Sequence, residues 1–404
     1  MRTYLRTNCR LCKSKALKKF FSFPSSPIGD DYKAKPTMHQ KKYPLDLYVC
    51  EECNFVQLGY VIDPKKVYGD YLYVTKTSSG LKQHFYKFFQ FLKKKKLFKK
   101  NSKVLEIGSN DGTFQKFFHH FGCETLGIDP AKKINEETNL KNISDFFSYN
   151  LAKKISNNKI FDLILANNVV ANIDDLDNFF KGVVKILTKK GFFVMETFSL
   201  QGVVKNNLID NIYHEHLSYF TIKPLLNYAK KFGLKLFYAK HTKVKGGSLR
   251  LIFTRNKFIN NDALLDASIK KEKLNKVISF KSLQNFNNLN EINDEKISKI
   301  LLKLSKGNKK IFGFGASVGS TTLAYRYKIF KYLNFIFDDD PKKWDLFLPG
   351  SKIKVVKPKK IAKNSYVFLF AWRYKENILS RHIKKLKGSK LIIPLPSLKI
   401  TNLK

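Results

Sequence analysis

The sequence predicts an α/β protein with a Rossmann-like, doubly wound sheet, a small cysteine-bearing domain before it and a second Rossmann-like domain after it. Three observations lead to this prediction: two CxxC pairs near the N-terminus, and two separate runs of alternating strands and helices, each opening with a glycine-rich turn. The 404 residues suffice for two to three hydrophobic cores. We expect domains over residues 1–70, 71–255 and 306–404, with a helical linker over 256–305.

Four of the five cysteines form the pairs Cys9-x2-Cys12 and Cys50-x2-Cys53. The two thiolates of a CxxC pair converge, and two pairs complete the tetrahedral shell that is typical of structural Zn²⁺. Disulfides or unrelated thiol pairs are the alternative, which a reducing compartment disfavours. Because four protein ligands leave no open coordination position, we expect a zinc ion that supports the fold of the N-terminal domain.

The formal net charge of +44 raises the question of a polyanionic partner. However, the lysines are spread over every segment, which favours a general compositional bias and an anionic small-molecule substrate over nucleic acid. Nucleic acid, acidic polymers and membrane surfaces stay open as alternatives. The N-terminus lacks the apolar core of a secretion signal, and no apolar run approaches the roughly 20 residues that span a bilayer. We therefore expect a cytoplasmic protein.

The first sheet domain opens with the segment NSKVLEIGSNDGTF. Residues 104–107 predict a buried parallel strand, Gly108, Asn110 and Gly112 a tight turn, and residues 113–118 the start of a helix. The next strand ends in Asp129, where a carboxylate can accept both ribose hydroxyls of an adenosine. A ligand is expected at this carboxyl edge of the strands.

The turn reads ExGSNDG rather than GxGxxG, and its strand carries Glu106. This pattern favours S-adenosylmethionine over NAD, because a sulfonium with a free amino acid has no pyrophosphate to place on the helix N-terminus. Asn167 and Asn168 end the third strand, where they contact the donor or substrate, or else cap the strand. The expected donor-binding residues are Tyr71, Glu106, Gly108, Asn110, Gly112, Asp129, Pro130 and Asn167.

The second alternating region begins at residues 309–327 with a strand, a glycine turn and a helix. Exposed N–H groups at such a helix start can hold a diphosphate, and the alternative is a turn that packs closely without a ligand. Arg250 offers a two-pronged donor suited to phosphate, although a solvent-facing arginine is the plainer interpretation. The expected substrate-binding residues from these patterns are Asn168, Gly247, Ser248, Arg250, Gly313, Gly315 and Ser317.

The segment NIYHEHLSYF, residues 211–220, concentrates polar side chains between apolar neighbours. If the segment is extended, His214 and His216 lie on one side and Glu215 on the other, which argues against all three as metal ligands. A catalytic group and a structural hydrogen-bond cluster are the remaining interpretations.

Taken together, these segments resemble the bacterial nucleotide-sugar C-methyltransferases. The resemblance extends over nearly the whole chain and rests on the CxxC pairs, DYLYVTKTSS, VLEIGSNDGTF, NNVVANIDDLDNF, IYHEHLSYF, GGSLR, FGFGASVGSTTL and FIFDDDPKKWDLFLPG. It implies a zinc domain, a donor-binding domain and a C-terminal domain that helps to hold a nucleoside-diphosphate keto-deoxysugar. The resemblance also implies that Asn172 faces the sugar and binds the substrate. This chain departs from the family at Asn172 and Lys245, where histidines are usual, and in its GASVGST turn.

The resemblance also places the catalytic residues at Tyr213, Glu215 and His216. Methylation of carbon requires a carbanion, so a base must remove a proton beside a carbonyl group, and a histidine is unprotonated near neutral pH. We assign the base to His216 and the hydrogen bond to the carbonyl oxygen to Tyr213, and expect Glu215 to orient the imidazole or a sugar hydroxyl. The alternative functions are an RNA-directed or other small-molecule-directed methyltransferase and a non-catalytic binding protein. We expect the protein to be a monomer.

Overall fold

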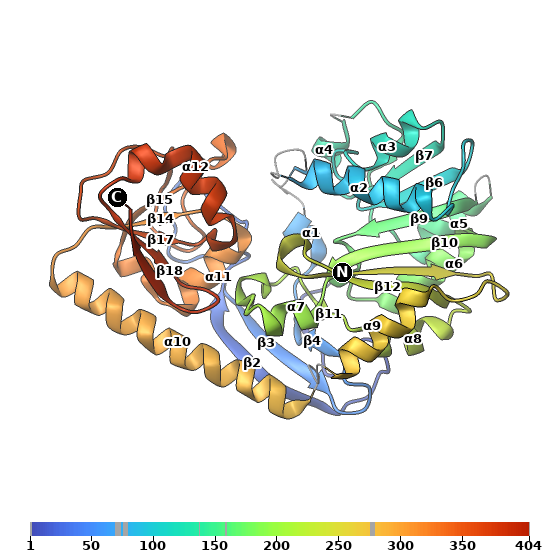
Figure 1. Cartoon of the computed structure of the whole chain (residues 1–404), viewed down its shortest axis with the longest axis horizontal. Coiled ribbons are helices and arrows are strands. Elements are labelled where there is room, and N and C mark those ends of the chain that lie inside the picture. The colour runs from blue at the N-terminus through green and yellow to red at the C-terminus, as the bar shows by residue number, and fades with distance from the viewer. Residues whose placement is uncertain are drawn as a thin grey trace.

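The computed structural model describes residues 2–68, 74–75, 80–136, 138–157, 160–274 and 279–403. It consists of two lobes joined below by the N-terminal domain and by a long helix (Figure 1). Tyr71, which the sequence assigns to the donor site, lies outside the described residues. Within those residues, no helix combines the length and apolar character that a bilayer span needs.

The N-terminal domain is a small antiparallel sheet that recruits a strand from far along the chain. Its strand order is β11-β4-β3-β2, and β11 immediately follows the Tyr-His-Glu-His segment. The Tyr-His-Glu-His segment is therefore anchored to the cysteine-bearing domain through the pairing of β11 with β4. The strands of this sheet are β2 (Leu17–Ser26), β3 (Tyr43–Cys50), β4 (Val56–Leu58) and β11 (Ser218–Tyr219), and β1 (Tyr4–Leu5) pairs with β5 (Tyr60–Val61) in a separate two-stranded sheet.

The central domain holds a seven-stranded sheet of order β12-β13-β10-β9-β6-β7-β8. Five neighbouring strands run parallel, and β13 lies antiparallel between β10 and β12. This confirms the expected Rossmann-like fold. The strands are β6 (Lys103–Ile107), β7 (Glu124–Ile128), β8 (Asn142–Ile143), β9 (Phe161–Asn167), β10 (Leu187–Phe198), β12 (Lys235–Thr242) and β13 (Ser248–Thr254).

Helices cover both faces of this sheet. Helix α2 buries Leu81, Phe85, Phe88, Phe89 and Leu92, a spacing that forms one apolar stripe against the sheet. The helices are α1 (Pro64–Tyr68), α2 (Leu81–Lys94), α3 (Gln115–His120), α4 (Lys132–Glu136), α5 (Tyr149–Ser156), α6 (Leu176–Ile186), α7 (Leu200–Lys205) and α8 (Ile222–Lys230).

Two helices follow the central sheet. Helix α9 (Ala263–Leu274) packs on this sheet, where Ser268 donates to the carbonyl of Ala239 in β12 at 2.7 Å. Helix α10 (Phe280–Lys306) then runs along the lower edge of the molecule to the C-terminal lobe (Figure 1).

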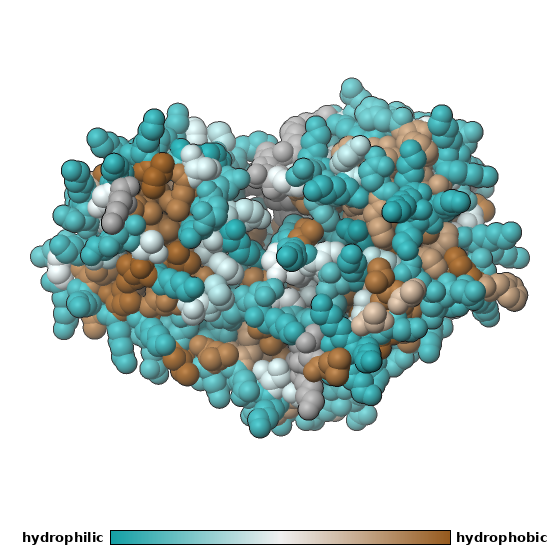
Figure 2. All heavy atoms as spheres, viewed as in Figure 1, coloured by the Kyte–Doolittle hydropathy of each residue, from teal (hydrophilic) through white to brown (hydrophobic). Residues whose placement is uncertain are grey.

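The C-terminal domain is a second, mostly parallel sheet of order β16-β15-β14-β17-β18-β19. Hydrophilic side chains are spread over the visible face of both lobes (Figure 2). The elements are β14 (Ile311–Phe314), α11 (Val318–Arg326), β15 (Leu333–Phe337), β16 (Val355–Val356), β17 (Tyr366–Leu369), α12 (Lys375–Leu386), β18 (Lys390–Ile393) and β19 (Lys399–Asn402), with 3-10 turns η5 (Ile329–Lys331), η6 (Pro341–Lys343) and η7 (Trp372–Tyr374). The 3-10 turns of the central domain are η2 (Val170–Asn172), η3 (Ile209–Asn211) and η4 (Val244–Gly246).

Candidate active site and metal centre

The four paired cysteines converge on one point of the N-terminal domain. The sulfur atoms of Cys9, Cys12, Cys50 and Cys53 all lie within 4.8 Å of one another. The separation is 3.6 Å between Cys9 and Cys53 and 3.5 Å between Cys12 and Cys50. Four thiolates at this spacing fit a tetrahedral zinc ion, which confirms the expected site. Among the described residues no other group of histidines, cysteines and acids has metal-binding geometry.

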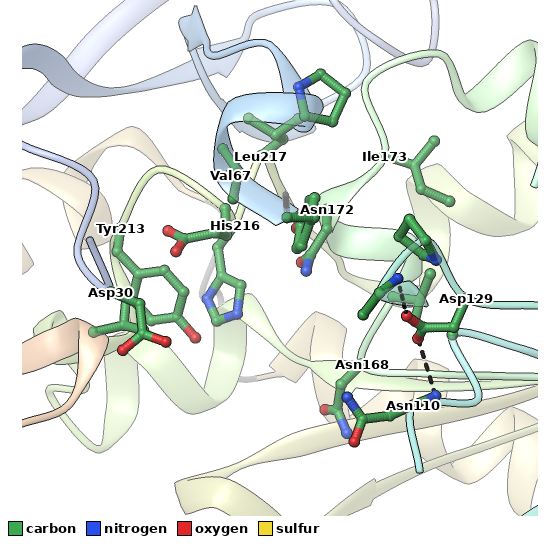
Figure 3. Close-up of a pocket in the computed structure, with 18 of the residues that line it drawn as sticks. Asp30, Val67, Asn110, Asp129, Asn168, Asn172, Ile173, Tyr213, His216 and Leu217 are labelled. Carbon is green, nitrogen blue, oxygen red and sulfur yellow. Dashed lines mark hydrogen bonds between the residues drawn. The ribbon is translucent and has the colours of Figure 1, made fainter. Parts of the chain in front are cut away.

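A cavity of about 800 Å³ lies where the three domains meet. The carboxyl edge of the parallel strands, where the sequence predicts the methyl donor, lines one end, here called the donor end. The Tyr-His-Glu-His segment and the C-terminal domain line the other end (Figure 3). Of the residues that the sequence assigns to a site, those that line this cavity are Glu106, Gly108, Asn110, Asp129, Pro130, Asn167, Asn168, Asn172, Tyr213, Glu215, His216 and Ser317.

The donor end is organised by Asp129, which follows β7. Its two carboxylate oxygens accept the backbone N–H groups of Asn110 and Ala131, each at 2.9 Å. The acid thereby fixes the turn after β6 at the wall of the cavity. Burial raises its pKa, and the two N–H groups oppose that shift. At Gly108, φ is +72°, and a Cβ atom would lie 2.0 Å from Val169, so this position requires glycine.

Two buried polar side chains at the same edge have atoms without hydrogen-bond partners in the structure. They are Oε2 of Glu106 and both amide atoms of Asn167. Burial raises the pKa of Glu106 well above its ordinary value. Buried polar atoms are almost always paired, so these atoms are suited to a polar ligand such as the amino-acid end of S-adenosylmethionine.

The Tyr-His-Glu-His segment is a turn, and the extended conformation expected from the sequence is wrong. The N–H of His216 donates to the carbonyl of Tyr213 at 3.0 Å, which closes the turn. The two imidazoles consequently point to different surroundings. His214 is buried against β3, with Nε2 at 3.2 Å from the carbonyl of Tyr43, and so serves as a structural contact.

The ring of His216 lies between two aromatic rings at the cavity wall. Its centroid is 4.1 Å from that of Phe198 and 3.9 Å from that of Tyr213. Its Nδ1 atom is 2.7 Å from the carbonyl oxygen of Asn211. Since a carbonyl only accepts hydrogen bonds, Nδ1 carries the proton and Nε2 carries the lone pair. Burial lowers the pKa of His216 to about 3, with contributions from the positive charges of Lys245 and Arg373.

The two other residues of the segment are held in their protonated forms. Burial raises the pKa of Glu215 to about 8 and that of Tyr213 well above its ordinary value. Both are therefore hydrogen-bond donors at neutral pH. In Figure 3, His216 lies between Tyr213 on one side and Asn172 on the other, with Asn110 and Asp129 beyond.

Arg250 does not line the cavity, nor is it exposed to solvent. Its guanidinium donates to the carboxylate of Glu196 through Nε at 2.8 Å and Nη2 at 2.7 Å, and it lies 3.4 Å from the ring centre of Phe88. The other oxygen of Glu196 is 2.5 Å from Nε2 of His84. Arg250 thus belongs to a buried ionic cluster beneath α2, which corrects its assignment to the substrate.

Several glycines assigned to ligands have packing roles instead. A Cβ atom at Gly247 would meet Gly202 at 2.7 Å, and one at Gly315 would meet Ala371 at 2.4 Å. Ser248 donates to the carbonyl of Val244 at 3.0 Å. None of these three lines the cavity, and neither do Gly112 and Gly313.

Sequence reasoning missed the cavity residues that come from distant segments. Asp30 of the N-terminal domain pairs with Lys343 of the C-terminal domain at 3.6 Å. Arg373 and Tyr374 of η7 also line the cavity, as does Asn211. No local motif marks Asp30, Arg373 or Tyr374. Asn211 and Lys343 lie in the segments NIYHEHLSYF and FIFDDDPKKWDLFLPG, which were the signal that could have found them.

Comparisons with known proteins agree with this three-part organisation. A family described as a zinc binding domain matches residues 9–68, one described as a methyltransferase domain matches residues 81–239, and one described as a C-methyltransferase C-terminal domain matches residues 243–396. Fold and site therefore define an S-adenosylmethionine-dependent methyltransferase. More particularly, the chain belongs to the C-methyltransferases that carry an N-terminal zinc-binding domain and a C-terminal C-methyltransferase domain.

The chain is similar to the C-methyltransferase NovU of Streptomyces niveus, with 26% identity in a 403-residue alignment that covers 96% of this chain and 95% of that protein. It is also 31% identical over 104 residues to the ubiquinone biosynthesis O-methyltransferase of Pelagibacter ubique (strain HTCC1062), a match that covers 25% of this chain and 43% of that protein. Among solved structures, the PH0226 protein of Pyrococcus horikoshii OT3 is 18% identical, with a TM-score of 0.37 over 47% of this chain and 98% of that one.

Proposed function

We propose that this C-methyltransferase acts on a nucleoside-diphosphate keto-deoxysugar and methylates a carbon beside the keto group. The observation that carries the proposal is the geometry of His216. Its Nδ1–H is held by a backbone carbonyl, which leaves the Nε2 lone pair for a substrate proton in the cavity that also contains the donor end. When bound, the sulfonium supplies an electrophilic methyl group, and alignment with the substrate carbon supplies the remaining advantage.

In this proposal His216 removes the proton next to the carbonyl, and a positioned base contributes roughly 10²–10⁴-fold to the rate. Tyr213 and protonated Glu215 are the donors near this imidazole, and one of them bonds the carbonyl oxygen as negative charge grows there. The other bonds a sugar hydroxyl. A donor held in a water-poor cavity is most effective in this role because little reorganisation is needed.

A diphosphate on the substrate would raise the low pKa of the His216 imidazole when the substrate binds. Burial is the largest cause of the low pKa of His216, and the positive charges of Lys245 and Arg373, which both line the cavity, lower it further. A bound diphosphate near these two cations offsets their part of the shift, so substrate binding raises the pKa of the base. We further propose that the donor is held by Glu106, Gly108, Asn110, Asp129 and Asn167, whose side chains and turn surround the donor end.

The test is incubation of the protein with S-adenosylmethionine and a panel of keto-deoxysugar nucleotides. We expect release of S-adenosylhomocysteine and a mass gain of one methylene on at least one sugar nucleotide. His216→Gln is expected to abolish turnover while donor affinity survives, whereas the exposed control His120→Gln retains activity. Methyl transfer to RNA, or no transfer to any keto-sugar, contradicts the proposal.

A further inference from the structure

The C-terminal domain makes a set of contacts to the loop that holds His216. Arg373, in η7, bonds η3 through its side chain, and its guanidinium divides its donors over three acceptors. Nη2 pairs with Asp210 at 2.9 Å, and Nη1 donates to the side-chain oxygen of Asn211 at 3.0 Å. Nη1 also reaches the carbonyl of Lys245 at 3.1 Å.

The η3 turn is buried and is contacted by a second part of the C-terminal domain. Asp210 and Asn211 are each 6% exposed. The first turn of α11 packs against the same turn, since a Cβ atom at Gly319 would lie 2.4 Å from the carbonyl oxygen of Asp210. The η3 turn is thus held both by the start of α11 and by the guanidinium of Arg373, which belong to the C-terminal domain.

The last residue of η3, Asn211, carries the carbonyl group that decides which nitrogen of the His216 imidazole holds the proton. The carbonyl of Asn211 accepts Nδ1–H of His216 at 2.7 Å, and it belongs to the residue whose side chain is bonded to Arg373. A shift of this carbonyl would remove the preference for a proton on Nδ1, because the ring has stacking partners on its faces that do not discriminate between its nitrogens.

We propose that Arg373 is a positioning residue that fixes His216 in the tautomer with a free Nε2, acting through Asn211. A residue of the C-terminal domain thereby makes the base of the central domain competent. The consequence for catalysis rests on the function proposed above, but the tautomer does not. Arginine suits this role because a planar fork can bind a carboxylate and an amide oxygen together.

The test is ¹⁵N NMR of the histidine side chains, with the His216 signals assigned by their loss in His216→Gln. The chain contains eight histidines, so the spectrum is tractable. We expect a protonated Nδ1 and a pyridine-type Nε2 in the wild type without any substrate. Arg373→Met is expected to move both signals toward a mixture of tautomers. The control Arg381→Met removes a pair with Asp339 on the same domain, at 2.8 Å, and is expected to change nothing.

Asn211→Leu is a second variant that keeps the carbonyl but removes the side-chain acceptor. It is expected to change the His216 signals in the same direction, and the double variant to add little more. If the proposed function holds, Arg373→Met also lowers kcat by about 10²-fold while donor affinity is unchanged. A wild-type tautomer in folded Arg373→Met, or in Asn211→Leu if the first variant does not fold, overturns the inference. Failure of the keto-sugar assay alone would overturn only the proposed function.

Discussion

Replacing Arg250 by methionine separates a structural role from a substrate-binding role. Glu196 and Arg250 are direct partners in the antiparallel register of β10 and β13, and the side chain of Glu196 is only 1% exposed. Burial raises the pKa of Glu196, but the hydrogen bond from His84 and the charge of Arg250 outweigh it and hold the pKa below its ordinary value. The carboxylate is therefore charged in the folded protein and depends on its partners.

Arg250→Met keeps an apolar chain over Phe88 and leaves that carboxylate without its bidentate partner. Breaking a buried pair on one side costs about 3–5 kcal/mol. For a domain of this size that corresponds to a fall of roughly 6–20 °C in the melting temperature of the central domain. Adding Glu196→Gln removes the unpaired charge, so the double variant is expected to regain most of the loss.

Differential scanning calorimetry of the wild type, the two single variants and the double variant gives a complete double-mutant cycle. Several domains unfold, so the lowest transition is compared rather than a single global value. An unchanged melting temperature together with a raised KM for the sugar nucleotide would refute the structural role of Arg250. It would restore the phosphate-binding role that the sequence predicts.

Three further predictions follow from the site. The pKa of Glu215 is raised from 4.5 to about 8, so the unfolded chain loses that proton at lower pH than the folded chain and the free energy of unfolding falls between those pH values. Wild-type activity should also fall above pH 8, where the folded protein loses the proton. In a pH–rate profile Glu215→Gln should lack this decline, and a decline that persists in the variant would show that another group causes it. Cys53→Ser should lose the zinc measured by metal analysis and expose the N-terminal domain to proteolysis, whereas Cys123→Ser should keep one zinc per chain; a stable, zinc-free Cys53→Ser protein would contradict a structural metal. Asp129→Asn should weaken donor binding about 10–100-fold in calorimetry, since a hydrogen bond to a charged acceptor is lost, while the exposed Asp345→Asn should not; equal affinities would place the donor elsewhere.

Local sequence patterns predict the features whose parts lie close together in the chain. The two CxxC pairs, the turn around Gly108 and the acid at Asp129 each follow from spacing and from strand–turn–helix order. The zinc shell and the Rossmann-like sheet could therefore be anticipated. The turn at Tyr213 to His216 could not, because alternation alone does not distinguish a short extended segment from a tight turn.

The features that sequence analysis missed depend on pairings between distant segments. Arg250 meets Glu196 only because β13 runs antiparallel beside β10 in one register, and the sequence does not specify that register. Arg373 approaches the active site only after the C-terminal domain docks against η3. For such residues, charge and burial decide the role, and neither can be read from a local motif.

The most direct test of the central claim is exchange of the substrate proton with solvent. A keto-deoxysugar nucleotide accepted in the methylation assay is incubated with the protein in D₂O without the methyl donor, and deuterium at the carbon beside the carbonyl is followed by NMR. Wild-type protein is expected to incorporate deuterium at that carbon, and His216→Gln, with normal donor affinity, is expected not to. Exchange at the wild-type rate in His216→Gln would show that another group removes the proton.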